Sequence, residues 1–280
     1  MSKGIVVLAQ NNTNDDYVLQ ACLLAMSLQT YNDTKISLIT NDTVPNNYIS
    51  LFDKIIPIPF NDSADKSEWK IENRWKIYHA SPYDETIVMD TDMLVLQNID
   101  IWWKFLSNYE MFFVNRVLNY RGEIANTSYY RKTFIKNNLP NLFSGFHYFK
   151  KCVFAQEFYQ WLELVVNNWQ AFYEQHLEPS TRPKHMSMDV CASIVTRILD
   201  CEDKITNNHV KFPSFTHMKT RCQDWSEIPT SWQDQMGVYV SKDGSIKIGN
   251  YAQTGILHYT EKDFLEKSPA FERYRSLANV

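Results

Sequence analysis

Short, mostly apolar runs alternate with helix-like stretches through the first hundred residues. Four of these runs predict strands: residues 5–8, 35–39, 55–58 and 86–89. Between the first two runs, apolar residues recur at helical spacing from about Tyr17 to Gln29. Strands that alternate with helices indicate a mainly parallel sheet with helices on its faces. The pattern therefore predicts a mixed α/β fold.

Helix-start signals accompany this alternation. Asn14 or Asp15 is available as the N-cap of the first helix, and Pro45 can begin a short helix that runs through Leu51. The stretch from Trp69 to Ala80 predicts a further helix that leads into the fourth apolar run.

The rest of the chain is less regular. Residues 111–114 predict a strand, and the polar segment 115–141 predicts a long loop or lid. Residues 142–149 have strand character that Ser144 and Gly145 interrupt. The other predicted elements are helices at 154–173 and 188–199, a hairpin of 237–241 with 245–248, and a strand at 255–259. No internal repeat or linker divides the chain, so we expect one domain over residues 1–280.

Two carboxylates follow the fourth apolar run directly, in the sequence Asp90-Thr91-Asp92. Side chains at positions i and i+2 of a strand point the same way, so Asp90 and Asp92 would project together from the strand end. Open α/β sheets bind their ligands at that edge. Paired carboxylate oxygens suit Mg²⁺ or Mn²⁺, which in turn binds phosphate oxygens. This spacing therefore predicts a divalent metal site, although two polar residues at a strand end form the same pattern.

Composition narrows the class of protein. The chain has 280 residues with a net charge of −4, and this charge favours neither nucleic acid nor an anionic membrane as a partner. Five cysteines without a C-x-x-C pair predict free thiols in a reducing compartment. The apolar run near Met1 is too short for a signal peptide, and no apolar run reaches the roughly 20 residues that span a bilayer. We therefore expect a cytoplasmic protein with no transmembrane segment.

The segment 73–100 resembles the GT-A glycosyltransferases, and within them the glycogenin-like and galactosyltransferase-like enzymes of glycosyltransferase family 8. Those enzymes carry a basic helix, an apolar strand, a metal-binding D-x-D and an "L-V-L-x-x-I-D" continuation, and all four are present here. The resemblance is good over residues 1–115 and traceable to about 260. It implies a nucleotide-sugar-binding half at 1–115, an acceptor-side half at 116–280, and a mainly parallel, Rossmann-like central sheet.

The resemblance also implies roles for individual residues. Asp90, Asp92 and His258 would hold Mn²⁺ or Mg²⁺, and Asp189 would act beside the anomeric carbon of the donor sugar. The remaining positions that match donor contacts in the family, together with Asp90 itself, are Leu8, Ala9, Gln10, Asn11, Asn41, Asp42, Arg74, Lys76, Thr91, Ser144, Gly145 and Lys262.

Three departures from the family pattern accompany these matches. Phe143 stands where the sugar loop usually has Asn, and Val190 stands where Gln usually follows the aspartate. The tail from His258 to Lys262 is shorter than usual and lacks the family's Gly and Pro-Trp.

The function that the resemblance implies is transfer of a hexose from a nucleotide-diphospho-sugar, UDP-linked by preference, to an acceptor hydroxyl, with retention of anomeric configuration. An oligosaccharide, a lipid-linked glycan, a protein and a modified nucleobase all fit the sequence as acceptors. Two alternatives stay open. A haloacid-dehalogenase-type phosphatase would use Asp90 as its nucleophile. A non-catalytic nucleotide-sugar- or glycan-binding protein would account for Phe143 and Val190.

Several site residues also have purely structural alternatives. Asp189 is a carboxylate that a helix start favours, and His258 fits a buried structural histidine. Arg74, Lys76 and Lys262 fit solvated positive charges equally well. His217, Lys219 and Arg221 form a further cluster. These residues would either line an acceptor groove or lie at a solvated strand end.

Overall fold

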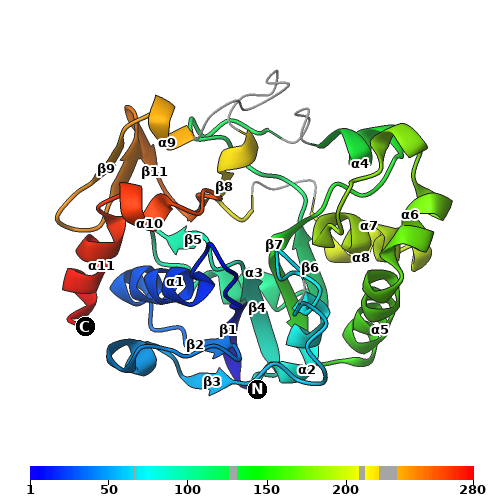
Figure 1. Ribbon diagram of the computed structural model, residues 1–280, viewed down its shortest axis with the longest axis horizontal. Coiled ribbons are helices and arrows are strands. Elements are labelled where there is room, and N and C mark those ends of the chain that lie inside the picture. The colour runs from blue at the N-terminus through cyan, green and yellow to red at the C-terminus, as the bar shows by residue number, and fades with distance from the viewer. Residues whose placement is uncertain (66, 126–130, 208–211, 221–231) are drawn as a thin grey trace.

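The protein is a mixed α/β molecule in which helices cover both faces of a central sheet (Figure 1). The computed structural model describes residues 1–65, 67–125, 131–207, 212–220 and 232–280. The predicted fold class is confirmed.

The central sheet has six strands in the order β3-β2-β1-β4-β7-β6. The first four are parallel, and β7 runs antiparallel to both of its neighbours. Every residue of β2, β4 and β6 is buried, which explains the continuous apolar runs in the sequence. The bounds are Lys3–Leu8 (β1), Ile36–Ile39 (β2), Lys54–Ile56 (β3), Glu85–Met89 (β4), Met111–Val114 (β6) and Phe143–Lys150 (β7).

The order of the strands creates a crevice between β1 and β4. The chain proceeds from β1 to β2 and β3 on one side, then returns to place β4 on the other side of β1. Val7 lies beside Met89 in the parallel register, so the two strands end next to each other. Ligands bind at such a switch point in open α/β sheets.

The helices lie in two layers, each over its own apolar core. On one face, α1 (Tyr17–Tyr31) packs against the C-terminal helix α11 (Ala270–Ala278). On the other face, α5 (Val153–Asn167) packs against α7 (Met188–Ile198). The shorter α-helices are Ile77–Ala80 (α2), Trp102–Leu106 (α3), Lys132–Lys136 (α4), Trp169–His176 (α6), Glu202–Ile205 (α8), Trp232–Gln235 (α9) and Phe264–Lys267 (α10). The 3-10 helices are Asn46–Leu51 (η1), Arg74–Lys76 (η2), Pro179–Thr181 (η4) and Met218–Thr220 (η5).

Two three-stranded sheets complete the fold. In the first, β12 (Ile256–His258) lies between β5 (Met93–Val95) and β8 (Phe215–His217). It brings the C-terminal part of the chain beside the residues that follow β4. The second is the antiparallel sheet of β9 (Val238–Val240), β10 (Ile246–Ile248) and β11 (Tyr251–Gln253), which includes the predicted hairpin.

Several local predictions were wrong. The helix expected over 69–80 is only η2 followed by α2, because Lys70 adopts a left-handed φ of 54° that a helix does not tolerate. The expected helix over 154–173 divides into α5 and α6 at Asn168. The strand at 142–149 is continuous through Gly145, and the segment 115–141 contains the short helix α4.

The first helix also begins differently from the prediction. Its N-cap is Asp16, whose Oδ1 accepts a hydrogen bond of 2.8 Å from the Leu19 amide, instead of Asn14 or Asp15.

The described part of the chain shows two further features. Its four cysteines, Cys22, Cys152, Cys191 and Cys201, form no disulfide. None of its helices combines the length and apolar character that crossing a bilayer requires.

Candidate active site

A cleft of about 530 Å³ opens at the carboxyl edge of the central sheet, at the crevice between β1 and β4. Seven separate parts of the described chain line it, within the ranges 8–17, 69–74, 90–92, 143–145, 185–189, 215–219 and 258–262. The cleft thus collects residues from both halves of the sequence.

The backbone of Asp90-Thr91-Asp92 is fixed on both sides. The Asp90 amide donates to the Gly145 carbonyl at 2.9 Å, and the Asp92 carbonyl accepts from the Tyr259 amide at 3.1 Å. The hydroxyl of Thr91, between the two carboxylates, donates to Gln20 Oε1 on α1 at 3.4 Å.

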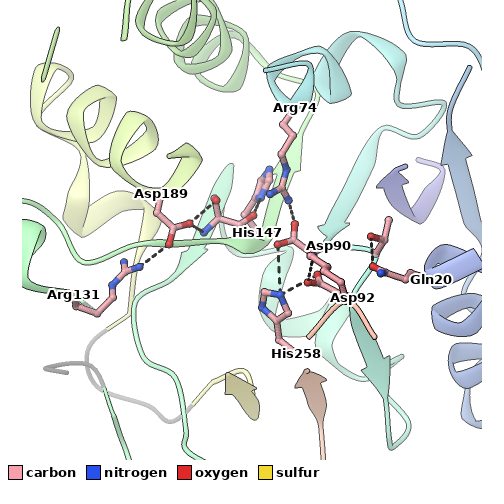
Figure 2. A network of polar contacts seen from close by, with 11 residues as sticks. Gln20, Arg74, Asp90, Asp92, Arg131, His147, Asp189 and His258 are labelled. Atoms are coloured by element: carbon pink, nitrogen blue, oxygen red, sulfur yellow. Dashed lines mark hydrogen bonds and ion pairs between the residues drawn. The ribbon is translucent and has the colours of Figure 1, made fainter. Parts of the chain in front are cut away.

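Asp90, Asp92 and His258 converge at the floor of the cleft (Figure 2). One ligand atom from each residue lies within 4.8 Å of the others. His258 Nε2 is 3.0 Å from Asp92 Oδ1 and 3.9 Å from Asp90 Oδ2. The structure brings together the three residues that the resemblance assigned to a metal.

Two cations neutralise the carboxylates. Arg74 forms an ion pair with Asp90 Oδ1, and Lys262 Nζ lies 2.9 Å from Asp92 Oδ2. Burial by itself would raise the pKa of Asp92, but the charges of Lys262 and His258 hold this pKa well below its usual range. Burial likewise opposes the charge on Lys262, yet Asp92 raises the pKa of that ammonium group. Asp92 is therefore a carboxylate at neutral pH.

This set of residues fits a divalent cation. Two carboxylates and an imidazole combine oxygen and nitrogen donors that Mn²⁺ and Mg²⁺ accept. The Nε2 atom of His258 faces the two carboxylates, and among the described residues its buried Nδ1 has no hydrogen-bond partner. The β12 strand holds the ring in place beside β5.

Gly145 permits the close approach of β7 to this floor. A Cβ at this position would lie 2.8 Å from Asp90 Oδ2 and 3.0 Å from Met93 Cε. Any larger residue would push Asp90 away from its partners.

Asp189 lies at the start of α7, in the wall of the cleft (Figure 2). Its Oδ1 accepts from the Ser144 amide at 2.8 Å and from the Ser144 hydroxyl at 2.6 Å, while its Oδ2 lies 2.6 Å from Arg131 Nη1. Burial alone would raise the pKa of Asp189, but Arg131 and Ser144 outweigh it and lower this pKa. Asp189 is thus an ionised, fixed carboxylate that accepts hydrogen bonds, and it is poorly suited to take up a proton.

Arg131, which pairs with Asp189, was not among the site residues predicted from the sequence. Its side chain is buried, and its guanidinium lies between the rings of Phe134 and Phe143, at 3.7 and 3.9 Å from their centroids. Arg131 is 58 residues away from Asp189 in the sequence, so no local pattern could have paired them. Phe143, which departs from the family pattern, here packs against this arginine.

The predicted nucleotide loops divide between cleft and scaffold. Leu8 and Gln10 line the cleft. Asn11 Oδ1 accepts a hydrogen bond of 3.0 Å from the Val18 amide in the first turn of α1, and the Asn11 amide donates to Asp42 Oδ2 at 2.7 Å. Neither Asn11 nor Asp42 lines the cleft. Nor do Ala9, which is buried, and Asn41, whose Oδ1 accepts from the Ile58 amide at 3.0 Å.

The two basic residues of η2 also differ in position. Arg74 lines the cleft, whereas Lys76 does not. Lys76 is buried, and its Nζ donates to the Asn61 carbonyl and, at 2.6 Å, to Asn73 Oδ1. Burial lowers the pKa of Lys76. The residue braces the loop before η2.

The structure describes two of the three residues that were predicted to line an acceptor groove. His217 and Lys219 line the cleft, and the ring of His217 lies 4.6 Å from that of His258 on the neighbouring strand. Burial and the adjacent His258 keep the pKa of His217 well below its usual range, so the ring is neutral. Arg221, the third member, lies outside the described residues.

No protein-family model matches this sequence, and no curated protein matches it. Among solved structures, the apo form of the bifunctional glycosyltransferase WbbM matches with a TM-score of 0.51 and 12% identity, over 99% of this chain and 49% of WbbM. The galactosyltransferase LgtC, in complex with donor and acceptor sugar analogues, matches with a TM-score of 0.49 and 13% identity over 99% of this chain and 95% of LgtC. The apo form of mouse xyloside xylosyltransferase 1 matches with a TM-score of 0.47 and 9% identity over 74% of this chain and 84% of that protein.

The chain spans about half the length of WbbM. At this level of identity the likeness to WbbM concerns the fold alone. The central sheet, the helices on both of its faces and the likeness to WbbM identify the architecture as the GT-A glycosyltransferase fold.

Proposed function

We propose that this protein is a metal-dependent glycosyltransferase of family 8 character. It would transfer a hexose from a nucleotide-diphospho-sugar, preferably UDP-linked, to a hydroxyl group of an acceptor. The observation that carries this proposal is the convergence of Asp90, Asp92 and His258 within 4.8 Å at the switch point of a GT-A sheet.

The residues of the cleft suit a leaving diphosphate. Negative charge develops on the phosphate as the glycosidic bond breaks, and a bound Mn²⁺ or Mg²⁺ would offset it. Lys262 is held beside the metal site by Asp92, and Arg74 is held there by Asp90. These two cations can bind phosphate oxygens without first having to be oriented.

Asp189 would act on the sugar side of the cleft. Because Arg131 and Ser144 keep it ionised, it can accept hydrogen bonds from sugar hydroxyls and stabilise positive charge near the anomeric carbon. Val190 cannot provide the amide found in family 8, and its side chain is buried in the core. Retention of configuration is part of the family 8 resemblance, and NMR of the first-formed product measures it.

The phosphatase alternative receives no support from the site. The D-x-D follows β4 rather than β1, and the Asp90 carboxylate forms an ion pair with Arg74. A nucleophilic carboxylate would need to be open to the substrate phosphorus.

The test compares wild type with Asp92→Asn. Titration calorimetry should show that wild type binds UDP with Mn²⁺ present and not without it, and a panel of UDP-sugars should show metal-dependent hydrolysis. Loss of a metal ligand should weaken Mn²⁺ binding by at least roughly 100-fold, because even outer-sphere partners cost 10- to 100-fold. Asp53→Asn is the matched control, since it breaks a similar aspartate–lysine pair of 3.0 Å outside the cleft.

Two outcomes would overturn the proposal. If wild type binds no nucleotide or nucleotide sugar with any divalent metal, the proposed donor is wrong. If it binds the donor tightly but neither hydrolyses nor transfers the sugar, the protein is a nucleotide-sugar-binding protein instead.

A further inference from the structure

One aromatic side chain in the cleft has an open face. Four Phe, Tyr and Trp residues line the cleft: Tyr17, Trp69, Phe143 and Phe215. Trp69 is 45% exposed, whereas the other three are 8%, 3% and 0% exposed respectively. Lys262 lies over the ring of Tyr17 at 4.9 Å, and Arg131 covers Phe143. Among the described Phe, Tyr and Trp residues that line the cleft, only Trp69 therefore offers a free ring face.

The loop that carries Trp69 is held on both sides of the ring. On one side, Asn12 Nδ2 donates to the Glu68 carbonyl at 2.9 Å. On the other, Lys70 Nζ donates to the carbonyls of Ala64 at 2.9 Å and Asp65 at 2.7 Å. These bonds hold the segment that presents the Trp69 ring at the cleft.

The same loop is attached to the end of β1. Gln10 Nε2 donates to Asp62 Oδ2 at 2.5 Å, and Asn73 Nδ2 donates to Gln10 Oε1 at 2.9 Å. Trp69 therefore stands on the β1 side of the crevice, while the Asp90–Asp92 metal site stands on the β4 side. A nucleoside diphosphate whose phosphates lie at the metal would extend its base toward β1.

We propose that Trp69 is the stacking surface for the nucleobase of the donor. This inference rests on the proposed function and adds a specificity-determining residue to it. Both polar atoms of the Gln10 amide are already engaged within the loop. Recognition at this end of the cleft therefore depends on the flat face of the base, and inorganic pyrophosphate lacks that contact.

The experiment measures UDP and pyrophosphate affinities in the presence of Mn²⁺ for wild type, Trp69→Ala and Trp69→Phe. Stacking of a base on an aromatic ring is worth a factor of roughly 5 to 150 by alanine substitution. Trp69→Ala should weaken UDP binding by that factor and leave pyrophosphate binding unchanged, and Trp69→Phe should keep most of the UDP affinity. Quenching of tryptophan fluorescence by UDP should also shrink in Trp69→Phe.

Phe60→Ala is the matched control. Phe60 lies before Trp69 in the same connection between β3 and η2 and is 67% exposed, but it does not line the cleft. Its substitution should change neither affinity.

Three results would overturn the inference. UDP affinity could be unchanged in Trp69→Ala, or UDP and pyrophosphate affinities could fall equally. The KM for an acceptor could also rise while donor affinity is unchanged, which would place the ring in an acceptor site. Wild type that binds neither UDP nor pyrophosphate with Mn²⁺ would contradict the proposed function itself, and that outcome is visible before any variant is made.

Discussion

At the scale of single residues, the cleft balances its charges in pairs. Arg74 is paired with Asp90, Lys262 with Asp92, and Arg131 with Asp189. These three pairs add no net charge, and a bound cation would supply further positive charge beside a diphosphate. This balance gives a physical reason to expect that donor binding depends on metal.

At the same scale, the buried side chain of His147 makes the stability of the fold depend on pH. Its Nδ1 lies 2.9 Å from the Ser144 carbonyl and its Nε2 lies 2.7 Å from the Tyr159 hydroxyl, an arrangement that suits the neutral ring. Burial lowers the pKa of His147 from 6.5 to about 3. The unfolded chain therefore takes up a proton at a higher pH than the folded protein, and the stabilising contribution of His147 is complete above pH 6.5.

We expect the free energy of unfolding to fall as pH decreases from 6.5 toward 3, by up to about 1.4 kcal/mol per pH unit from this residue. Urea unfolding of wild type and His147→Asn across this range isolates the effect, because the carboxylates titrate in both proteins. The destabilisation caused by His147→Asn should shrink as the pH is lowered. A difference that stays constant with pH would show that His147 is not held neutral by the fold.

At the scale of elements, the contact between β7 and the end of β4 positions the metal site. The Asp90 amide is bonded to the Gly145 carbonyl, and Gly145 has no room for a Cβ beside Asp90. The Ser144 that precedes it holds Asp189. One strand thus positions a carboxylate on each side of the cleft.

Gly145→Ala should therefore damage the site more than the fold. The new methyl group must displace Asp90 or Met93, which should weaken Mn²⁺ binding roughly 10-fold and cost about 1–3 kcal/mol of stability. Gly4→Ala is the control, because its Cβ would lie 2.4 Å from the Tyr83 ring, away from the cleft. Calorimetry with Mn²⁺ should show full affinity in Gly4→Ala. Equal losses in both variants would mean that Gly145 serves packing only.

At the scale of the whole molecule, the metal site joins distant parts of the chain. Asp92 is separated from His258 by 166 positions and from Lys262 by 170. The residues that follow β4 and those of β12 therefore have to fold together for the site to exist. The prediction of a single domain over residues 1–280 can therefore be tested through ligand binding.

Mn²⁺ and UDP should accordingly raise the stability of the complete chain in one transition. A ligand at about 100 times its Kd adds about 2.7 kcal/mol to the free energy of unfolding. Thermal or urea unfolding should show a single transition that shifts with ligand, and no shift should occur in Asp92→Asn. Two transitions, of which only one responds to ligand, would show that the halves fold separately.

The sequence determined the features that depend on local order. The apolar runs predicted the strands, and the spacing of Asp90 and Asp92 placed both carboxylates on one side of the strand end, because side chains alternate along a strand. The resemblance added His258 and Lys262, which the fold brings to Asp92. The local pattern was wrong over 69–80, where the left-handed backbone of Lys70 interrupts the expected helix.

Only the tertiary structure decided how these pieces meet. It paired Arg131 with Asp189, placed Lys76 in the scaffold instead of the cleft, and left the face of Trp69 open. Each of these results depends on contacts between segments far apart in the chain, which residue spacing does not encode. Order along the chain therefore specified which chemical groups the protein carries near its strand ends, and long-range packing decided which of them face a ligand.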